Sequence, residues 1–142
     1  MYNTILVAID GSDISEKAFE AAVEQAHAWK SDLHAIYVVE TGLFVDVPAD
    51  NNLEIMYSIL KREGNSNLAR VSEIAEKKGI TVTTHFEQGH AGSTILNKAE
   101  EIRADLIVVG SHGKSNVDRL LLGSVSSFVI EHCSKSVLVV RV

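Results

Sequence analysis

The sequence predicts an α/β protein built on one open, doubly wound parallel sheet of five strands, with helices on both faces. Short apolar runs alternate with longer segments of helical periodicity along the chain. The predicted strands are apolar on both faces, as expected for a parallel sheet that helices cover on both sides. The crossovers between such strands are right-handed. With 142 residues, the chain fits one domain over residues 1–142.

The first two elements follow each other directly. Residues 4–9 predict a buried strand, and the next four residues, Asp10 to Asp13, supply a turn and caps for a helix. This helix carries an apolar stripe at helical spacing, which we expect to pack on the sheet. The stripe consists of Phe19, Ala22, Val23, Ala26 and Trp29.

The middle of the chain contains a strand, an irregular stretch and a long helix. Residues 33–39 predict the second strand, and residues 40–50 contain the only proline. Residues 51–78 have helical periodicity, which Gly64 and Asn65 interrupt. We therefore expect one long helix with a break or kink at Gly64.

Five further elements complete a βαβαβαβαβ pattern. They are a strand at 80–87, a helix at 91–102, a strand at 106–109, a helix at 124–132 and a closing strand at 137–140. Ligands of such sheets bind beyond the carboxyl ends of the strands, where the strand order reverses. The loops after the first and fourth strands both belong at that edge.

Composition narrows the class of partner and the compartment. The 13 Lys and Arg residues against 19 Asp and Glu give a formal net charge of -6, which argues against DNA, RNA or an anionic membrane as a partner. A small nucleotide is compatible with this charge, because a few oriented amides can hold phosphates. We interpret the single cysteine, Cys133, as a small buried hydrophobe in a reducing compartment. The lack of a secretory leader or a membrane-spanning run favours a cytoplasmic protein without membrane insertion.

A glycine pattern after the fourth strand is the main indication of function. Gly110-x-x-Gly113 is followed by nine residues and then by Gly123-Ser124 at a predicted helix start, with Ser126 beside them. Small residues and exposed backbone N–H groups at such a place suit a phosphate chain. A short Gly-x-x-Gly also serves a simple turn. The spacing of all these positions together predicts a phosphate cradle.

Several catalytic motifs are missing. Val108 stands where a P-loop needs its first glycine, and no Gly-x-Gly-x-x-Gly follows the first strand. Gly-x-Ser-x-Gly and metal-site histidine spacings are also absent, so we assign no catalytic residue and no metal ligand. His112 would touch a phosphate or be a solvated loop residue. Asp10 would accept a ribose hydroxyl or help to hold a cation, or else cap the first helix.

The closing strand predicts an interface between two copies of the chain. Residues 137–140 are all apolar, and an uncovered strand edge of this kind favours pairing with a second copy. We therefore expect a two-fold dimer through this edge. The alternative is that Arg141 and a neighbouring loop shield it.

Three ordered segments resemble landmarks of the universal stress protein family, and the resemblance covers nearly the whole chain. They are Ile5-Leu6-Val7-Ala8-Ile9-Asp10-Gly11-Ser12, Ala104-Asp105-Leu106-Ile107-Val108-Val109-Gly110-Ser111-His112-Gly113 and Ser136-Val137-Leu138-Val139-Val140. Members of that family that bind ATP carry Gly-x-x-Gly, nine residues, and then Gly followed by Ser or Thr. This chain matches the ATP-binding pattern in full.

The resemblance implies an adenine nucleotide alpha hydrolase-like fold with sheet order 3-2-1-4-5 and a homodimer through the fifth strand. It also implies an adenine nucleotide site for ATP, with or without Mg or Mn. Ala8 and Asp10 would line the adenosine side of this site, and Val38 would contact adenine. The groups around ribose and phosphates would be Gly110, Gly113, Gly123, Ser124, Val125 and Ser126.

Together, these observations lead us to expect a cytoplasmic, ATP-binding stress-response module with slow or no ATP hydrolysis. Two alternatives stay open. One is an enzyme that hydrolyses ATP or processes another nucleotide through His112 or a metal-bound water near Asp10. The other is an interaction protein that binds no nucleotide.

Overall fold

The computed structural model describes residues 1–40, 51–112 and 122–141, and within these ranges five parallel strands form one sheet. The strand order is β3-β2-β1-β4-β5, which confirms the expected doubly wound topology. The strands are β1 (Thr4–Ile9), β2 (Asp32–Glu40), β3 (Val82–Gly89), β4 (Leu106–Gly110) and β5 (Ser136–Val140). The strand order reverses at β1, since β2 pairs on one side of it and β4 on the other.

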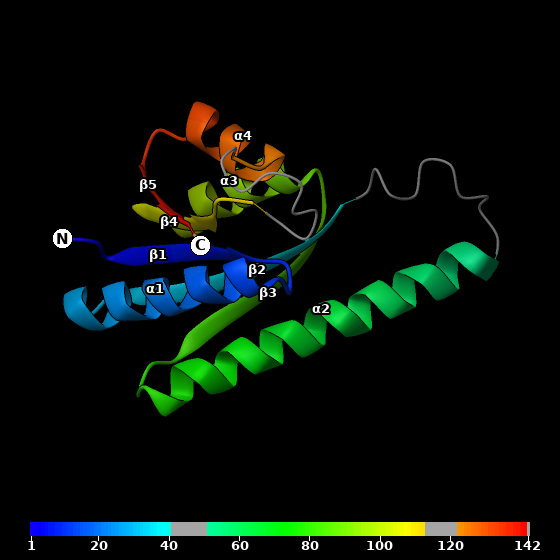
Figure 1. Cartoon of the computed structure of the whole chain (residues 1–142), viewed down its shortest axis with the longest axis horizontal. Helices are drawn as coiled ribbons and strands as arrows, with labels where there is room; N and C mark the ends of the chain where they lie inside the picture. Colours follow the sequence, from blue (N-terminus) through cyan, green and yellow to red (C-terminus); the bar gives the residue numbers. More distant parts are fainter. Residues whose placement is uncertain (41–50, 113–121, 142) are drawn as a thin grey trace.

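In the part of the chain that the structure describes, four helices cover the sheet in two layers. They are α1 (Asp13–Trp29), α2 (Asn51–Lys77), α3 (Ala91–Ile102) and α4 (Ser124–His132). Figure 1 shows α1 and α2 on one face and α3 and α4 on the other. The expected helices therefore lie on both faces, as the apolar character of the strands requires.

The two faces of the sheet have separate cores. Successive side chains of a strand point to opposite faces, so Ile5 and Val7 pack with α1 and α2, whereas Leu6 packs with α3 and α4. The second core also contains Ile36 and Ile107, both with no exposed surface. These cores hold the carboxyl ends of β1, β2 and β4 at one edge.

The first helix is capped as expected but does not bury its whole stripe. The Ser15 N–H donates to Ser12 Oγ at 3.2 Å, which caps α1. Trp29, the last residue of α1, is 44% exposed, so the expectation that it packs on the sheet is wrong. Its ring packs edge-on against Tyr2, and its indole N–H donates to Gln25 Oε1 at 3.1 Å. The indole body thus has an aromatic neighbour and its polar end has a partner.

The long helix α2 is continuous through Gly64, so the expected break or kink is wrong. Gly64 is buried because α2 passes close to the sheet at this point. A Cβ atom there would lie 2.6 Å from Phe86 Cε2 and 2.8 Å from Tyr37 Cδ1. The glycine therefore permits close helix-to-sheet packing and does not end the helix.

The third strand begins two residues later than its sequence pattern indicates. The Ile80 N–H donates to Ala75 O at 2.9 Å and the Gly79 N–H donates to Glu76 O at 2.9 Å. Gly79 has a φ of 74°. These bonds form a helix-ending Schellman motif, so Ile80 closes α2 and is not part of β3.

The only cysteine is less buried than expected. Cys133 is half-buried beside the core that faces α3 and α4. Its Sγ accepts from the Lys135 N–H at 3.3 Å, where the chain leaves α4. The side chain is therefore partly an apolar neighbour of the core and partly a cap on a turn.

Candidate functional site

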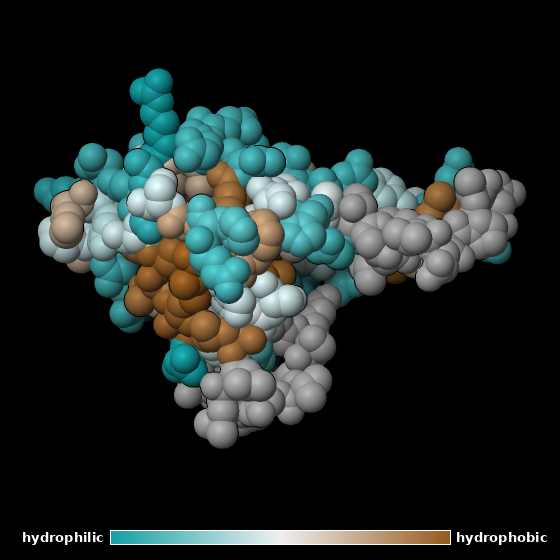
Figure 2. Space-filling view, turned by 90° about the horizontal axis from the view of Figure 1, so that it is seen from above, coloured by the Kyte–Doolittle hydropathy of each residue, from teal (hydrophilic) through white to brown (hydrophobic). Residues whose placement is uncertain are grey.

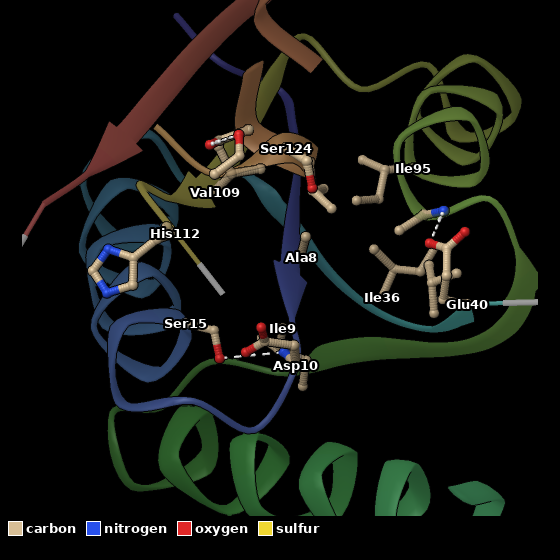
Figure 3. A pocket seen from close by; sticks show the side chains of 16 residues that line it. Ala8, Ile9, Asp10, Ser15, Ile36, Glu40, Ile95, Val109, His112 and Ser124 are labelled. Carbon is tan, nitrogen blue, oxygen red and sulfur yellow. Dashed lines mark hydrogen bonds between the residues drawn. The ribbon is translucent and has the colours of Figure 1, made fainter. Parts of the chain in front are cut away.

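A cavity of about 430 Å³ lies at the carboxyl ends of β1, β2 and β4. This is the place where the strand order reverses, and there a parallel sheet usually binds its ligand. Figure 3 shows the side chains that surround it. The lining residues are Ala8, Ile9, Asp10, Ser15, Ile36, Val38, Glu40, Ala91, Ile95, Val109, Gly110, His112, Gly123, Ser124, Val125 and Ser126.

The cavity brings together all but one of the site residues that the sequence predicted, and the remaining one lies outside the described ranges. Those in the wall are Ala8, Asp10, Val38, Gly110, Gly123, Ser124, Val125 and Ser126. Gly113 belongs to the undescribed segment 113–121. Segments that are far apart in the sequence thus meet at one edge of the sheet.

The start of α4 faces the cavity with backbone donors that no side chain of the described residues caps. Gly123 is the N-cap residue and provides no side-chain hydrogen bond to the helix. The first intrahelical bond runs from the Ser127 N–H to Gly123 O at 3.0 Å, so the N–H groups of the preceding residues have no helical acceptor. Ser124 is exposed at this point. The arrangement offers amides and a hydroxyl to an anion.

Ser126 holds the glycine segments in place. Its Oγ lies 3.0 Å from both Ser111 O and Gly123 O, to which it can donate, and the residue is only 3% exposed. The Gly123 N–H also donates to Ser111 O at 2.6 Å. The serine therefore joins the end of β4 to the start of α4, a positioning role that its sequence position did not indicate.

The packing of β4 against α1 explains why a glycine stands at position 110. A Cβ atom at this position would lie 3.1 Å from Ile14 Cγ1, in the first turn of α1. The end of β4 can approach α1 only because no side chain intervenes. Gly110 therefore allows close packing as well as an open cavity wall.

Asp10 serves as a turn residue and also lines the cavity. Its Oδ1 accepts from the Ser12 N–H at 2.9 Å and from Ser12 Oγ at 2.5 Å. Its backbone N–H donates to Ser15 Oγ at 3.2 Å. Figure 3 shows Asp10 and Ser15 on the same side of the cavity as His112. The hydrogen bonds fix a carboxylate at this wall.

His112 is half-buried at the cavity, two residues after the end of β4. Its Nδ1 lies 3.2 Å from Ser111 Oγ. The phosphate contact of His112 stays a prediction, as does its alternative as a solvated loop residue. The ring belongs to the polar side of the wall.

The opposite side of the cavity is apolar except for one carboxylate. Ile36, Val38 and Ile95 line it together with Glu40. Glu40 Oε2 accepts from the Ala91 N–H at 2.9 Å, at the first residue of α3. The first turn of α3 is also capped by His90, whose Nδ1 accepts from the Ser93 N–H at 3.1 Å.

Sequence reasoning missed several wall residues. Ile36 shares a strand face with Val38 because it is two positions earlier, so strand parity could have indicated it. Glu40 is the last residue of β2 and hence reaches the same edge. Ile95 carried no such signal, since only the packing of α3 on the sheet brings it to the cavity.

Among residues 1–40, 51–112 and 122–141, no group of three or more His, Cys, Asp or Glu side chains is arranged to hold a metal ion. None of the helices in these ranges has the length and apolar character needed to cross a membrane.

The fold and the cavity define a doubly wound α/β protein with a cavity at its topological switch point, where such sheets usually bind ligands. The family model described as the Universal stress protein family matches residues 1–141. The chain belongs to the universal stress protein family.

Individual relatives agree with this assignment. The chain is 38% identical over 141 residues to universal stress protein MJ0531 of Methanocaldococcus jannaschii, covering 99% of this chain and 83% of the relative. The solved structure of hypothetical protein MJ0577 superimposes with a TM-score of 0.86 at 28% identity, covering 100% of this chain and 97% of that one. A universal stress protein in complex with cAMP gives a TM-score of 0.75 at 27% identity, over 99% and 97% of the two chains.

Proposed function

We propose that the cavity binds an adenine nucleotide, ATP, with the phosphates at the start of α4 and the base at the apolar side. The observation that carries this proposal is the N-terminus of α4, which lines the cavity and which no side chain among residues 1–40, 51–112 and 122–141 caps. Unpaired N–H groups and the positive end of the helix dipole favour phosphate oxygens. The similar universal stress protein in complex with cAMP supports an adenine nucleotide as the ligand class.

The dimensions and the polarity of the cavity fit this ligand. Its volume of about 430 Å³ lies within the range typical of small-molecule sites. Val38, which is half-buried in the lining, offers an apolar surface for a purine on one side, and the buried side chains of Ile36 and Ile95 also belong to this lining. Asp10, across the cavity, offers a carboxylate acceptor for a ribose hydroxyl.

The proposal includes a regulatory role with slow or no ATP hydrolysis, and ATP that binds with or without Mg or Mn. A nucleotide can change the shape or the partner of such a protein only if it binds two conformations of the protein with different affinities. We further propose that residues 1–142 act as one universal stress protein domain in the cytoplasm. The single cysteine supports a reducing compartment.

A charge placed at the start of α4 tests the phosphate position. Ser124→Asp puts a carboxylate at an exposed first-turn position, where it favours the helix dipole and so preserves the fold. We expect ATP to bind at least about tenfold more weakly to this variant, because juxtaposed like charges are strongly unfavourable. Isothermal titration calorimetry with ATP measures the change.

The matched control for this experiment is Asn97→Asp. Asn97 is exposed on α3 and does not line the cavity, so the variant adds the same charge elsewhere and should keep the affinity of the unmodified protein. Equal ATP affinity in Ser124→Asp and the unmodified protein would contradict a phosphate site at α4. Failure of the unmodified protein to bind ATP would contradict the proposed function as a whole.

A further inference from the structure

In the described part of the chain, the N-termini of α3 and α4 both border the cavity, and they differ in whether an anion can use them. At α3, the Ala91 N–H is taken by Glu40 Oε2 and the Ser93 N–H by His90 Nδ1. At α4, the N-cap is Gly123, and no side chain in the described part of the chain caps the helix. A negatively charged phosphate is therefore favoured at α4 and repelled by the carboxylate at α3. This contrast gives the site a direction, with the uncharged end of a nucleotide beside Glu40.

Glu40 is held in a defined orientation at that end. Its Oε2 accepts a hydrogen bond from the Ala91 N–H at 2.9 Å, and Ala91 is the first residue of α3. Figure 3 shows Glu40 beside Ile36 and on the side of the cavity away from Asp10 and His112. In the described part of the chain, Oε1 of this carboxylate takes no hydrogen bond, so it is available to a ligand.

The groups around Glu40 distinguish a base that carries an N–H donor from a base that lacks one. An ionised carboxylate only accepts hydrogen bonds, and its neighbours Ile36, Val38 and Ile95 offer no competing side-chain donor or acceptor. A base that directs an N–H at Oε1 forms a charge-assisted hydrogen bond. A base without this donor shields Oε1 from water and gives it no partner, which is costly.

We propose that Glu40 is a specificity-determining residue that accepts a hydrogen bond from the exocyclic amine of the bound base. The inference rests on the proposed nucleotide function and deepens it. The orientation held by the Ala91 N–H makes the carboxylate select for amine-bearing bases, and the phosphate contacts at α4 are independent of this selection.

The test compares ATP with purine riboside 5′-triphosphate, in which a hydrogen replaces the amine. The unmodified protein should bind ATP at least about tenfold more tightly, the scale expected for one hydrogen bond to a charged group. In Glu40→Gln, the side-chain carbonyl can still accept from the Ala91 N–H, which preserves the start of α3. Its remaining NH₂ group then faces the amine of the base, so the preference for ATP should fall to within about twofold.

The control and the outcomes separate this inference from the proposed function. Glu20→Gln, at an exposed position of α1, removes the same charge away from the cavity and should keep the full preference. If the unmodified protein binds both triphosphates equally, or if Glu40→Gln keeps the preference, Glu40 does not select the base while the nucleotide function stands. If the unmodified protein binds neither triphosphate, the proposed function and this inference both fail.

Discussion

At the scale of single residues, Gly64 shows how a side chain's absence can be a packing requirement. Sequence pattern alone marks a glycine inside a helix as a weak point, because glycine costs about 1 kcal/mol relative to alanine there. In the folded chain, the rings of Phe86 and Tyr37 occupy the space that a Cβ atom would need. The residue therefore stabilises the contact of α2 with β2 and β3.

We predict that Gly64→Ala destabilises the protein in spite of its better helix propensity. Overpacking a core typically costs about 1–3 kcal/mol, which exceeds or matches the propensity gain of about 1 kcal/mol. The free energy of unfolding in urea measures the balance. Asn65→Ala, at the next and exposed position of α2, is the control and should be neutral or stabilising. A Gly64→Ala protein more stable than the unmodified one would contradict the packing role.

The glycine and serine positions of the cavity wall were accessible to sequence reasoning, whereas their partners were not. Gly110, Gly123 and Ser124 stand out through spacing along a short stretch of chain. Glu40 meets Ala91 across 51 positions of sequence. Spacing rules describe neighbours along the chain, so a contact of this kind is visible only after the sheet and α3 are in place.

At the scale of elements, β2 and β3 carry a histidine pair that should make stability depend on pH. His34 Nδ1 lies 3.0 Å from His85 Nε2, with the two rings stacked at a centroid distance of 5.2 Å. Burial lowers the pKa of His34 below 6.5, as does the charge of Lys98, while Asp32 opposes the shift. The pKa of His85 is lowered by burial and by the charges of Lys98 and His34. The charges of Glu87 and Glu101 oppose this shift.

The direction of the pH effect follows from these lowered pKa values. Between the folded pKa values and 6.5, the unfolded chain binds more protons than the folded chain, so the free energy of unfolding decreases as pH falls through this window. We expect a lower free energy of unfolding at pH 5.5 than at pH 7.5. The double variant His34→Gln and His85→Gln should reduce that difference, as measured by urea unfolding at both pH values.

The control for the histidine pair is His27→Gln, at an exposed position of α1. This variant should retain the pH dependence of the unmodified protein. If the double variant loses as much stability between the two pH values as the unmodified protein does, other groups cause the effect and the histidine pair does not.

At the scale of the whole molecule, the open edge of β5 is the surface that we propose for homodimer formation. Within the described ranges, β5 pairs with β4 only, and its residues Val137 to Val140 are half-buried. Figure 2 views the molecule from the side of α4 and β5 and shows an apolar area at the surface. Edge strands of this character pair readily with a second copy.

We predict a dimer in solution that a charge on β5 disrupts. Sedimentation velocity should give about twice the mass of one chain for the unmodified protein and a monomer for Val139→Lys, since an edge lysine opposes strand pairing. Ser134→Lys, at an exposed position just before β5, should stay dimeric. A circular dichroism spectrum checks that Val139→Lys is folded. A monomeric unmodified protein would rule out the interface.

Local patterns sufficed to predict the order of strands and helices along the chain and most of their bounds. They also indicated Gly110 and Gly123, which line the cavity. They sufficed because burial and helical or strand periodicity repeat over a few residues. Three features became visible only in the folded chain: the continuity of α2 through Gly64, the exposure of Trp29 and the carboxylate of Glu40 at the apolar side of the cavity. Each depends on which distant residue fills the neighbouring space, and close packing between layers determines that.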